Sequence, residues 1–220
     1  MSHLNNTGQT RRRGRPRNDA APTPSLDDLL QTSAGIFARD GYDGVSLRKL
    51  QTELNVSYTF FHHYFDSKEA LWKAVIDRLA GATASKILAT LQNIDDTHNE
   101  LDALKEGIAI YIRSAFVDPS MYKIYQQESL QDGPRLDYIF QSYFAPAWQL
   151  IESMVAKVNQ LGIIKPIPIE SLFFVVQSAT APSVQLPFYQ HLTAKKPMNS
   201  TQIETHIQQS IDLLFHGWLK

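Results

Sequence analysis

The side chains best suited to chemistry in this sequence fall between residues 46 and 68, and the chemistry they suit is contact with nucleic acid. Arg48 can donate two hydrogen bonds to atoms O6 and N7 of a guanine, and Tyr58 and Thr59 can reach base edges or a thymine methyl group. Nearby hydroxyl, imidazole and ammonium groups suit phosphate oxygens, which fix the position of a protein on DNA without reading its sequence. The candidate DNA-binding residues of this stretch are Ser46, Arg48, Ser57, Tyr58, Thr59, His62, His63, Tyr64 and Lys68.

Three short helices are expected to position these side chains. Ser25, with Asp28 three residues later, is a capping-box start for a first helix, and the two glycines of residues 40–44 suit the backbone conformations that end it. Ser46 and Ser57 are N-cap residues for a second and a third helix. The stretch from residue 25 onward is therefore predicted to fold as one helix followed by a helix-turn-helix.

The third of these helices has an apolar back and a polar, aromatic front. Phe61 and Phe65, four residues apart, share one face and can anchor the helix to the first two. Asn55 precedes the helix and tolerates the left-handed backbone of a tight turn, and Asp66 or Ser67 caps a fourth helix. A short helix of this kind can enter the major groove of DNA, so the pattern favours DNA binding.

Other interpretations of the same residues are weaker. Simple solvation of a helical surface stays open for His62 and Tyr64, because Tyr64 can pack against its neighbours. A metal site at His62 and His63 is not expected, since adjacent residues diverge around a helix and no third ligand follows at a useful spacing. Catalysis is not expected either, because the chain has no phosphate-binding glycine loop, no Gly-x-Ser-x-Gly and no His-Glu-x-x-His motif.

Four segments in the expected order resemble the DNA-binding domain of the TetR (tetracycline-repressor-like) family of bacterial transcriptional regulators: residues 36–42, 46–48, 55–57 and 63–71. The resemblance implies an all-α fold of nine helices. It also implies an N-terminal helix-turn-helix domain over residues 25–76 and a C-terminal helical domain over residues 77–220 that binds an effector and dimerises. The sequence departs from the family pattern at Asn55, Phe60 and His62, where a glycine, a small residue and a tyrosine are usual.

An arginine-rich arm with a proline-containing linker occupies residues 1–24. Its basic segment lacks apolar side chains and is expected to be disordered when free. Gly14-Arg15-Pro16 flanked by arginines resembles an AT-hook, whose extended arginines lie in a narrow A·T minor groove. The alternative is a generic basic tail that raises non-specific affinity alone. The candidate contacts of the arm are Arg11, Arg12, Arg13, Arg15 and Arg17.

Charge and composition agree with a DNA-binding protein. The net charge is −1, yet residues 1–80 carry 11 Lys and Arg against 9 Asp and Glu, which leaves the remainder mildly acidic. The sequence has no cysteine, which fits the reducing interior of a cell. It also has no apolar run that approaches the roughly 20 residues of a membrane span. Because the polar amino end also predicts no signal peptide, we expect a cytoplasmic, nucleoid-associated protein without a cofactor, a metal or a membrane partner.

Apolar periodicity predicts six further helices after the third. Pro146 lies inside the longest helix of the second half, so a kink is expected there. The expected ranges are about 67–92, 100–117, 121–130, 134–160, 169–189 and 200–219.

The last two of these helices each carry an apolar stripe. The family resemblance implies that they pair across a twofold axis as a four-helix bundle, and the alternative is that both stripes pack inside one chain. A homodimer suits DNA recognition, because the DNA-binding domains of two copies can bind a palindromic operator with half-sites roughly 34–36 Å apart. The predicted interface residues are Leu172, Phe173, Val176, Ala179, Val184, Ile203, Ile207, Ile211 and Leu214.

An effector pocket is a further implication of the resemblance, which places it among the aromatic-rich middle helices. A largely apolar cavity would suit a hydrophobic or aromatic small molecule. Binding would favour a conformer whose heads no longer match the half-sites, so a repressor would leave its operator. The alternative is an effector-independent or architectural DNA-binding protein of the same fold. The candidate pocket residues are Tyr111, Arg113, Tyr122, Gln126, Tyr143, Phe144, Trp148 and Gln177.

Overall fold

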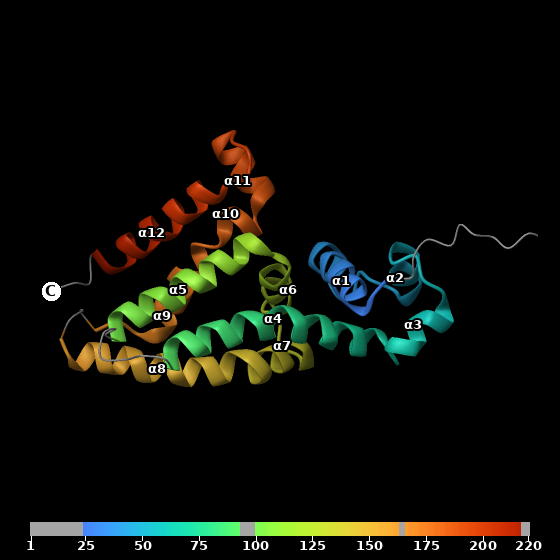
Figure 1. Ribbon diagram of the computed structural model, residues 1–220, viewed down its shortest axis with the longest axis horizontal. Coiled ribbons are helices and arrows are strands. Elements are labelled where there is room, and N and C mark those ends of the chain that lie inside the picture. Colours follow the sequence, from blue (N-terminus) through green and yellow to red (C-terminus); the bar gives the residue numbers. More distant parts are fainter. Residues whose placement is uncertain (1–23, 93–99, 163–165, 217–220) are drawn as a thin grey trace, which may run out of the picture.

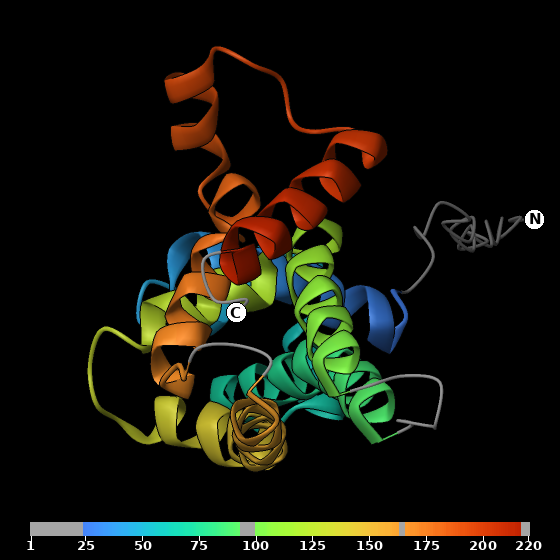
Figure 2. The ribbon, with the colours of Figure 1, turned by 90° about the vertical axis from the view of Figure 1, so that its left-hand side faces the viewer.

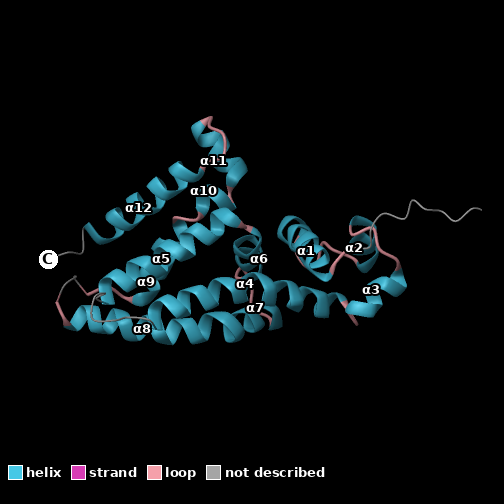
Figure 3. Ribbon diagram, in the orientation of Figure 1, coloured by secondary structure: helices cyan, strands magenta, loops and turns pink. Residues whose placement is uncertain are grey.

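The computed structural model describes residues 24–92, 100–162 and 166–216, and every regular element in these ranges is a helix (Figures 1 and 3). The predicted all-α class is therefore confirmed. The elements are α1 (Leu26–Asp40), α2 (Leu47–Glu53), α3 (Tyr58–Tyr64), α4 (Lys68–Gln92), α5 (Glu100–Val117), α6 (Ser120–Glu128), α7 (Pro134–Ile139), the π-helical turn η1 (Phe140–Phe144), α8 (Ala145–Gln160), α9 (Ile169–Ser178), α10 (Ala181–Val184), α11 (Leu186–Thr193) and α12 (Ser200–His216).

The helix starts in the first third of the chain follow the predicted caps. The Ser25 hydroxyl accepts the Asp28 N–H at 3.2 Å while the Asp28 carboxylate accepts the Ser25 N–H at 3.0 Å, which is a complete capping box. Ser46 and Ser57 each accept a backbone N–H at 3.1 Å at the starts of α2 and α3. Asn55 adopts the predicted left-handed backbone, with φ 53°.

The two glycines after α1 act in different ways. Gly41 ends the helix with φ 70°, a conformation that glycine adopts without strain. Gly44 does not take a positive φ. A Cβ atom there would lie 2.3 Å from the Asp40 carbonyl oxygen, so this position needs glycine for close backbone approach. The turn between α1 and α2 is thereby held tight.

Two apolar cores organise the chain. The first is formed mainly by α1 to α4, with Trp72, Phe37 and Phe61 fully buried, and it also takes in Ile124 of α6 and Ile139 of α7. The second is formed by α5, α8, α9 and α12. Figure 1 shows α2 and α3 at one end of the long axis, with α4 running from them into the body. The boundary between the two expected domains stays a prediction, since the first core continues beyond it.

The predicted helix over residues 134–160 is interrupted just before Pro146. The structure has a π-helical turn over Phe140–Phe144, and Pro146 lies in the first turn of α8. Proline has no N–H for the carbonyl four residues earlier, and its ring crowds that carbonyl. A widened turn accommodates both effects, so the expected irregularity takes the form of a π segment.

The predicted helix over residues 169–189 is wrong as a single element. The structure divides this region into α9, α10 and α11, and α10 and α11 each have a proline in their first turn, Pro182 and Pro187. Proline favours the first turn and disfavours the interior of a helix, which explains both breaks. The part of the chain that the structure describes therefore has more helical segments than the nine expected, within the same all-α architecture.

The carboxyl-terminal helices leave α11 exposed. None of its residues is buried, and Figure 2 shows it standing out from the body. Across residues 24–92, 100–162 and 166–216, none of the helices is long and apolar enough to cross a membrane.

Candidate functional site

The outward faces of α2 and α3 carry most of the predicted DNA contacts. Tyr58 is 66% exposed at the start of α3, whereas Phe61, which packs in the first core, is 1% exposed. The two helices lie at one end of the molecule (Figure 1). The exposed side chains of α2 and α3 form a polar and aromatic surface. Its exposed members are Ser46, Arg48, Ser57, Tyr58, Thr59, His63 and Tyr64.

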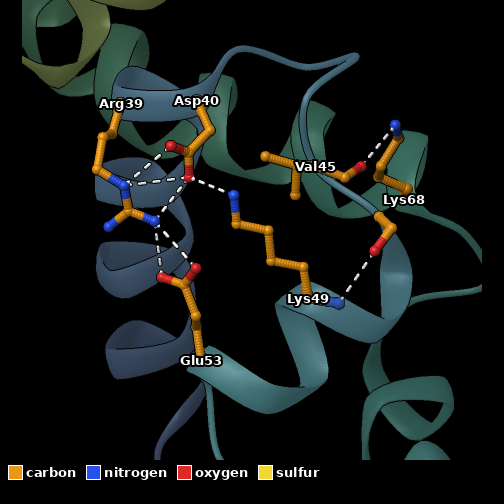
Figure 4. A network of polar contacts seen from close by, with 7 residues as sticks. Arg39, Asp40, Val45, Lys49, Glu53 and Lys68 are labelled. Carbon is orange, nitrogen blue, oxygen red and sulfur yellow. Dashed lines mark hydrogen bonds and ion pairs between the residues drawn. The ribbon is translucent and has the colours of Figure 1, made fainter.

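Neighbouring cations on α2 differ in their availability. The Lys49 Nζ lies 3.0 Å from an Asp40 carboxylate oxygen, and Arg39 donates to the carboxylates of both Asp40 and Glu53, as Figure 4 shows. Arg48 is paired with no carboxylate among the residues that the structure describes. Arg48 is therefore the cation of α2 that is free to meet DNA.

The same polar network fixes α2 against the end of α1. Hydrogen bonds from Arg39 and then Lys49 lower the pKa of Asp40 to about 2, and the bonds to Asp40 and Glu53 raise the pKa of Arg39. Asp40 and Arg39 therefore stay charged at neutral pH. Because Glu53 is the last residue of α2, the network ties both ends of that helix to α1 and sets its orientation.

Lys68 has a structural position that the sequence did not reveal. Its Nζ donates to the backbone carbonyls of Tyr42 at 3.1 Å and Val45 at 2.9 Å, and it lies 3.9 Å from the centre of the Tyr42 ring. These contacts attach the start of α4 to the turn between α1 and α2. They use two of the three ammonium donors, so the predicted phosphate contact stays a prediction with one donor left for it.

His62 supports the exposed ring of Tyr58. The two ring centres are 4.2 Å apart, and the His62 Nε2 atom is buried without a hydrogen-bond partner in the described ranges. Phe60 packs on the first core and against Tyr64, with ring centres 5.2 Å apart. The phosphate contacts predicted for His62 and Tyr64 stay predictions. The arm residues Arg11, Arg12, Arg13, Arg15 and Arg17 lie outside the described residues.

A second feature is an apolar cavity of about 150 Å³ in the body. It lies among α4, α5, α6, η1, α8 and α9. The predicted pocket residues that line it are Tyr111, Tyr122, Tyr143, Phe144 and Trp148. Its capacity to bind an effector stays a prediction.

The predicted polar residues of the pocket do not line this cavity. The Arg113 guanidinium makes two hydrogen bonds of 2.8 Å to Glu204 on α12, and Gln126 and Gln177 are also absent from the lining. The prediction that these three side chains face the cavity is therefore wrong. An apolar space offers a charged or amide group no partner, and burying such a group without one is unfavourable.

The apolar stripes predicted for the dimer interface are largely packed inside one chain. Ile207, Ile211 and Leu214 of α12 are buried on α5 and α9, and Val184 is buried beside Ala115.

The other predicted interface residues also have partners within the chain. Leu172, Phe173 and Val176 line the cavity, and Ala179 and Ile203 are partly buried against the second core. The alternative of internal packing therefore accounts for both stripes. The homodimer itself stays a prediction, and it would have to use side chains beside these stripes.

A hydrogen-bonded triad joins the cavity wall to α4. Tyr138 and Tyr143 both donate to the Oδ1 atom of Asp77, at 2.6 and 2.5 Å. Burial and then the bond to Asp77 raise the pKa of Tyr138 to about 12, and the same causes raise the pKa of Tyr143. Both phenols therefore remain protonated donors at neutral pH. Tyr143 also lines the cavity, and Asp77 belongs to the helix that leads to the DNA-binding end.

Aromatic contacts continue from this triad toward α2. The Tyr138 ring centre is 6.1 Å from that of Trp72, and Trp72 meets Tyr42 edge-on at 6.0 Å. Tyr42 lies beneath Lys68, whose ammonium holds the Val45 carbonyl just before α2. An unbroken set of contacts thus connects the cavity with the base of the helix-turn-helix.

The comparisons with known proteins agree with this geometry. Residues 29–75 match the family described as bacterial regulatory proteins, tetR family. The HTH-type transcriptional regulator RutR of Escherichia coli strain K12 is 24% identical over 152 residues, which are 69% of this chain and 70% of RutR. Residues 29–75 therefore carry the DNA-binding segment of the TetR family. The chain is a DNA-binding transcriptional regulator.

Solved structures show the TetR-family fold over most of the chain. The ketosteroid transcriptional regulator KstR2 of Mycobacterium tuberculosis is similar with a TM-score of 0.66 and 20% identity, over 88% of this chain and 94% of KstR2. AibR, solved with isovaleryl coenzyme A and operator DNA, is similar with a TM-score of 0.62 and 16% identity, over 85% of this chain and 96% of AibR. The predicted fold is confirmed, and the match over residues 29–75 agrees with the predicted family resemblance.

Sequence reasoning missed several contributors to the site. Tyr125 lines the cavity and stacks on Phe144 with ring centres 4.9 Å apart, and Phe173 of α9 lines it as well. Tyr125 could have been found, because its position three residues after Tyr122 places it on the same side of α6. Asp77 gave no such signal, since its two phenol partners are more than 60 residues away.

Proposed function

We propose that this regulator is a homodimeric repressor that reads a palindromic operator through α2 and α3 and leaves it when a small molecule occupies the cavity. The observation that carries the proposal is the exposed surface of α2 and α3, whose side chains are available to contact bases. Tyr58 and Thr59 stand exposed at the start of α3, and Arg48 is without an ionic partner in the described part of the chain. In helix-turn-helix proteins the start of the second helix meets base edges, so Tyr58 and Thr59 are proposed to contact bases. Arg48, at the start of α2, is proposed to reach a guanine beside them.

In this proposal the other candidate contacts hold the DNA-binding end, formed by α1 to α3, on the DNA backbone. Ser46, Ser57, His63 and Tyr64 are exposed around the readers and can meet phosphate oxygens. The arginines of residues 11–17 extend the contact into a flanking A·T-rich minor groove, where the negative potential is strongest. Operator binding assigns the protein to the cytoplasm, where bacterial DNA lies.

A second copy is proposed to cover the face that α9 and α12 leave exposed. Val175 is 47% exposed and Leu213 is 81% exposed, and both border a groove between α5, α9 and α12. Exposed apolar patches on a folded chain commonly mark interaction surfaces. A dimer formed here would carry two helix-turn-helix domains, which a palindromic operator requires. A monomer found by light scattering at micromolar concentration would contradict this part of the proposal.

Release of the operator is proposed to begin at Tyr143. A ligand in the cavity would press on this ring, whose hydroxyl is bonded to Asp77 of α4. A shift of α4 would move α1 to α3, since Lys68 and the first core join them to it. The change in operator affinity can be no larger than the preference of the ligand for the released conformer.

The alternative function is that of an effector-independent or architectural DNA-binding protein. The cavity and its link to α4 favour the ligand-responsive form. Two fold relatives are also described with small molecules in their names, a ketosteroid regulator and a regulator solved with isovaleryl coenzyme A. The two functions differ in that only the first predicts relief of operator binding by a cavity ligand.

Selection of bound duplexes from a random pool tests the proposal. The full chain should enrich one palindromic motif with half-sites about one helical turn apart. The chain without residues 1–18 should enrich the same core motif but lose the preference for A·T-rich flanks. A pool that remains random at physiological salt would overturn sequence-specific binding. Equal loss of affinity for A·T-flanked and G·C-flanked sites would overturn the role of the arm.

A further inference from the structure

The lining of the cavity has no charged side chain among the residues that the structure describes. It consists of aliphatic and aromatic groups with a few neutral polar atoms. Arg113, the cation that the sequence suggested, is held by Glu204 outside it. A carboxylate or phosphate group placed here would lose its hydration without gaining a cation, which is strongly unfavourable. The lining therefore selects against anions.

The phenol groups of the cavity differ in whether they are free to bind a ligand. The Tyr122 hydroxyl is already used, since it donates to the Tyr111 carbonyl at 2.8 Å and contacts the Ser114 hydroxyl. The Tyr143 hydroxyl is used by Asp77. The hydroxyls of Tyr111 and Tyr125 have no hydrogen-bond partner within the described ranges.

The state of these two phenols is fixed by their surroundings. Burial raises the pKa of Tyr111 and of Tyr125, so both carry their protons at neutral pH. The indole N–H of Trp148, which lines the same cavity, can only donate. A bound molecule that carries an acceptor oxygen can therefore receive a hydrogen bond from one of these donors.

The volume of the cavity limits the size of its occupant. At about 150 Å³ it is comparable to a dry, apolar cavity that accommodates one benzene ring. A molecule as large as a coenzyme thioester exceeds this volume, so much of it would lie outside the lining. A compact ring with a short substituent would fit.

We infer that the cavity binds an uncharged, compact apolar molecule whose carbonyl or ether oxygen accepts a hydrogen bond from Tyr111 or Tyr125. The inference rests on the proposed function only in naming this molecule as the effector. The chemical preference itself belongs to the cavity and can be measured without DNA.

Three probes of nearly equal shape separate charge from hydrogen bonding: acetophenone, benzoate and ethylbenzene. Calorimetric titration of the full-length protein at pH 7.5 should give an affinity for acetophenone about tenfold or more above that for benzoate. The double variant Tyr111→Phe with Tyr125→Phe should weaken acetophenone about 2- to 12-fold and leave ethylbenzene unchanged. Tyr189→Phe on α11, outside the cavity, is the matched control and should alter neither affinity.

Each result decides the inference. Benzoate binding as tightly as acetophenone, or no binding of any probe, would overturn it. Equal weakening of acetophenone and ethylbenzene in the double variant would overturn the hydrogen-bonding role of the phenols. Operator affinity is measured separately with acetophenone present. Selective binding of acetophenone without operator release supports the inference while refuting the effector part of the proposed function.

Discussion

Replacement of Lys68 by methionine should destabilise the protein far more than the loss of a surface lysine. Methionine keeps most of the length and the apolar stem of the side chain but removes the ammonium, which leaves the Val45 carbonyl without this donor and the Tyr42 carbonyl with the Val45 N–H alone. Hydrogen bonds to a charged group contribute about 1.5–3 kcal/mol each, and a cation over a ring about 0.5–1 kcal/mol. Because Lys68 is only partly buried and these contributions are not additive, we expect a loss of about 2–4 kcal/mol.

The matched control is Lys73→Met on the same helix. The Lys73 Nζ lies 2.7 Å from the exposed carboxylate of Glu69 one turn earlier and 5.3 Å from the centre of the Tyr138 ring. An exposed ion pair of this kind contributes little to stability, because solvent screens it. Urea unfolding followed by circular dichroism gives both free energies of unfolding. A loss in the Lys68 variant no larger than that in the Lys73 variant would refute the structural role.

The same pair of variants separates structural and phosphate-binding roles for Lys68. A phosphate contact adds about one unit to the slope of the logarithm of affinity against the logarithm of salt concentration. If Lys68 acts only by attaching α4 to the turn before α2, the folded variant should keep the salt slope of the unmodified protein. A slope smaller by about one unit would assign the remaining ammonium donor to DNA.

Other contacts in the molecule lead to four more expected outcomes. Arg48→Ala should weaken binding to the selected operator by about 1–3 kcal/mol per half-site and weaken binding to a scrambled duplex much less, as fluorescence anisotropy would measure; equal losses on both duplexes would assign Arg48 to phosphate. Tyr143→Phe should leave operator affinity without ligand nearly unchanged but reduce the operator release that saturating acetophenone causes in the same assay. Undiminished release would show that the hydrogen bond from Tyr143 to Asp77 does not transmit ligand binding to α4. Leu213→Glu should give a monomer by light scattering, whereas Leu130→Glu, at an equally exposed apolar site, should not; a dimer in the first variant would exclude that surface as the interface. Asp40 has a pKa of about 2 in the folded protein against an ordinary 3.8, so its contribution to stability is present above pH 3.8 and is lost as pH falls toward 2. Between pH 3.8 and 2 the melting temperature of Asp40→Asn should therefore fall less than that of the unmodified protein. An equal fall in both proteins would contradict this contribution of Asp40.

Local signals were sufficient to predict the DNA-binding end of the molecule. Ser25, Ser46 and Ser57 cap their helices as expected because an N-cap depends on a hydroxyl and on the next three residues. Asn55 takes the left-handed conformation for a similarly local reason. The exposed front and buried back of α3 also follow from its own periodicity, so the candidate reading face could be found without tertiary information.

Long-range partners could not be found in the same way. An apolar stripe indicates that Ile207 is buried but not whether α5 of the same chain or another copy buries it. The direction of Arg113 is set by Glu204, 91 residues later. Lys68 is held by carbonyls 23 and 26 residues earlier, which no pattern around it indicates. The breaks at the prolines of residues 182 and 187 did have a local signal, which the sequence interpretation overlooked.

Two copies of the chain are proposed to hold their α3 helices one turn of DNA apart, and the distance between the two heads tests this most directly. The chain has no cysteine, so Thr52→Cys, at an exposed site near the end of α2, allows a single nitroxide label per copy. Pulsed dipolar spectroscopy on the operator complex should give one narrow distance within a label's length of roughly 34–36 Å. The absence of any dipolar signal, or a distance too long for neighbouring major grooves, would contradict the account.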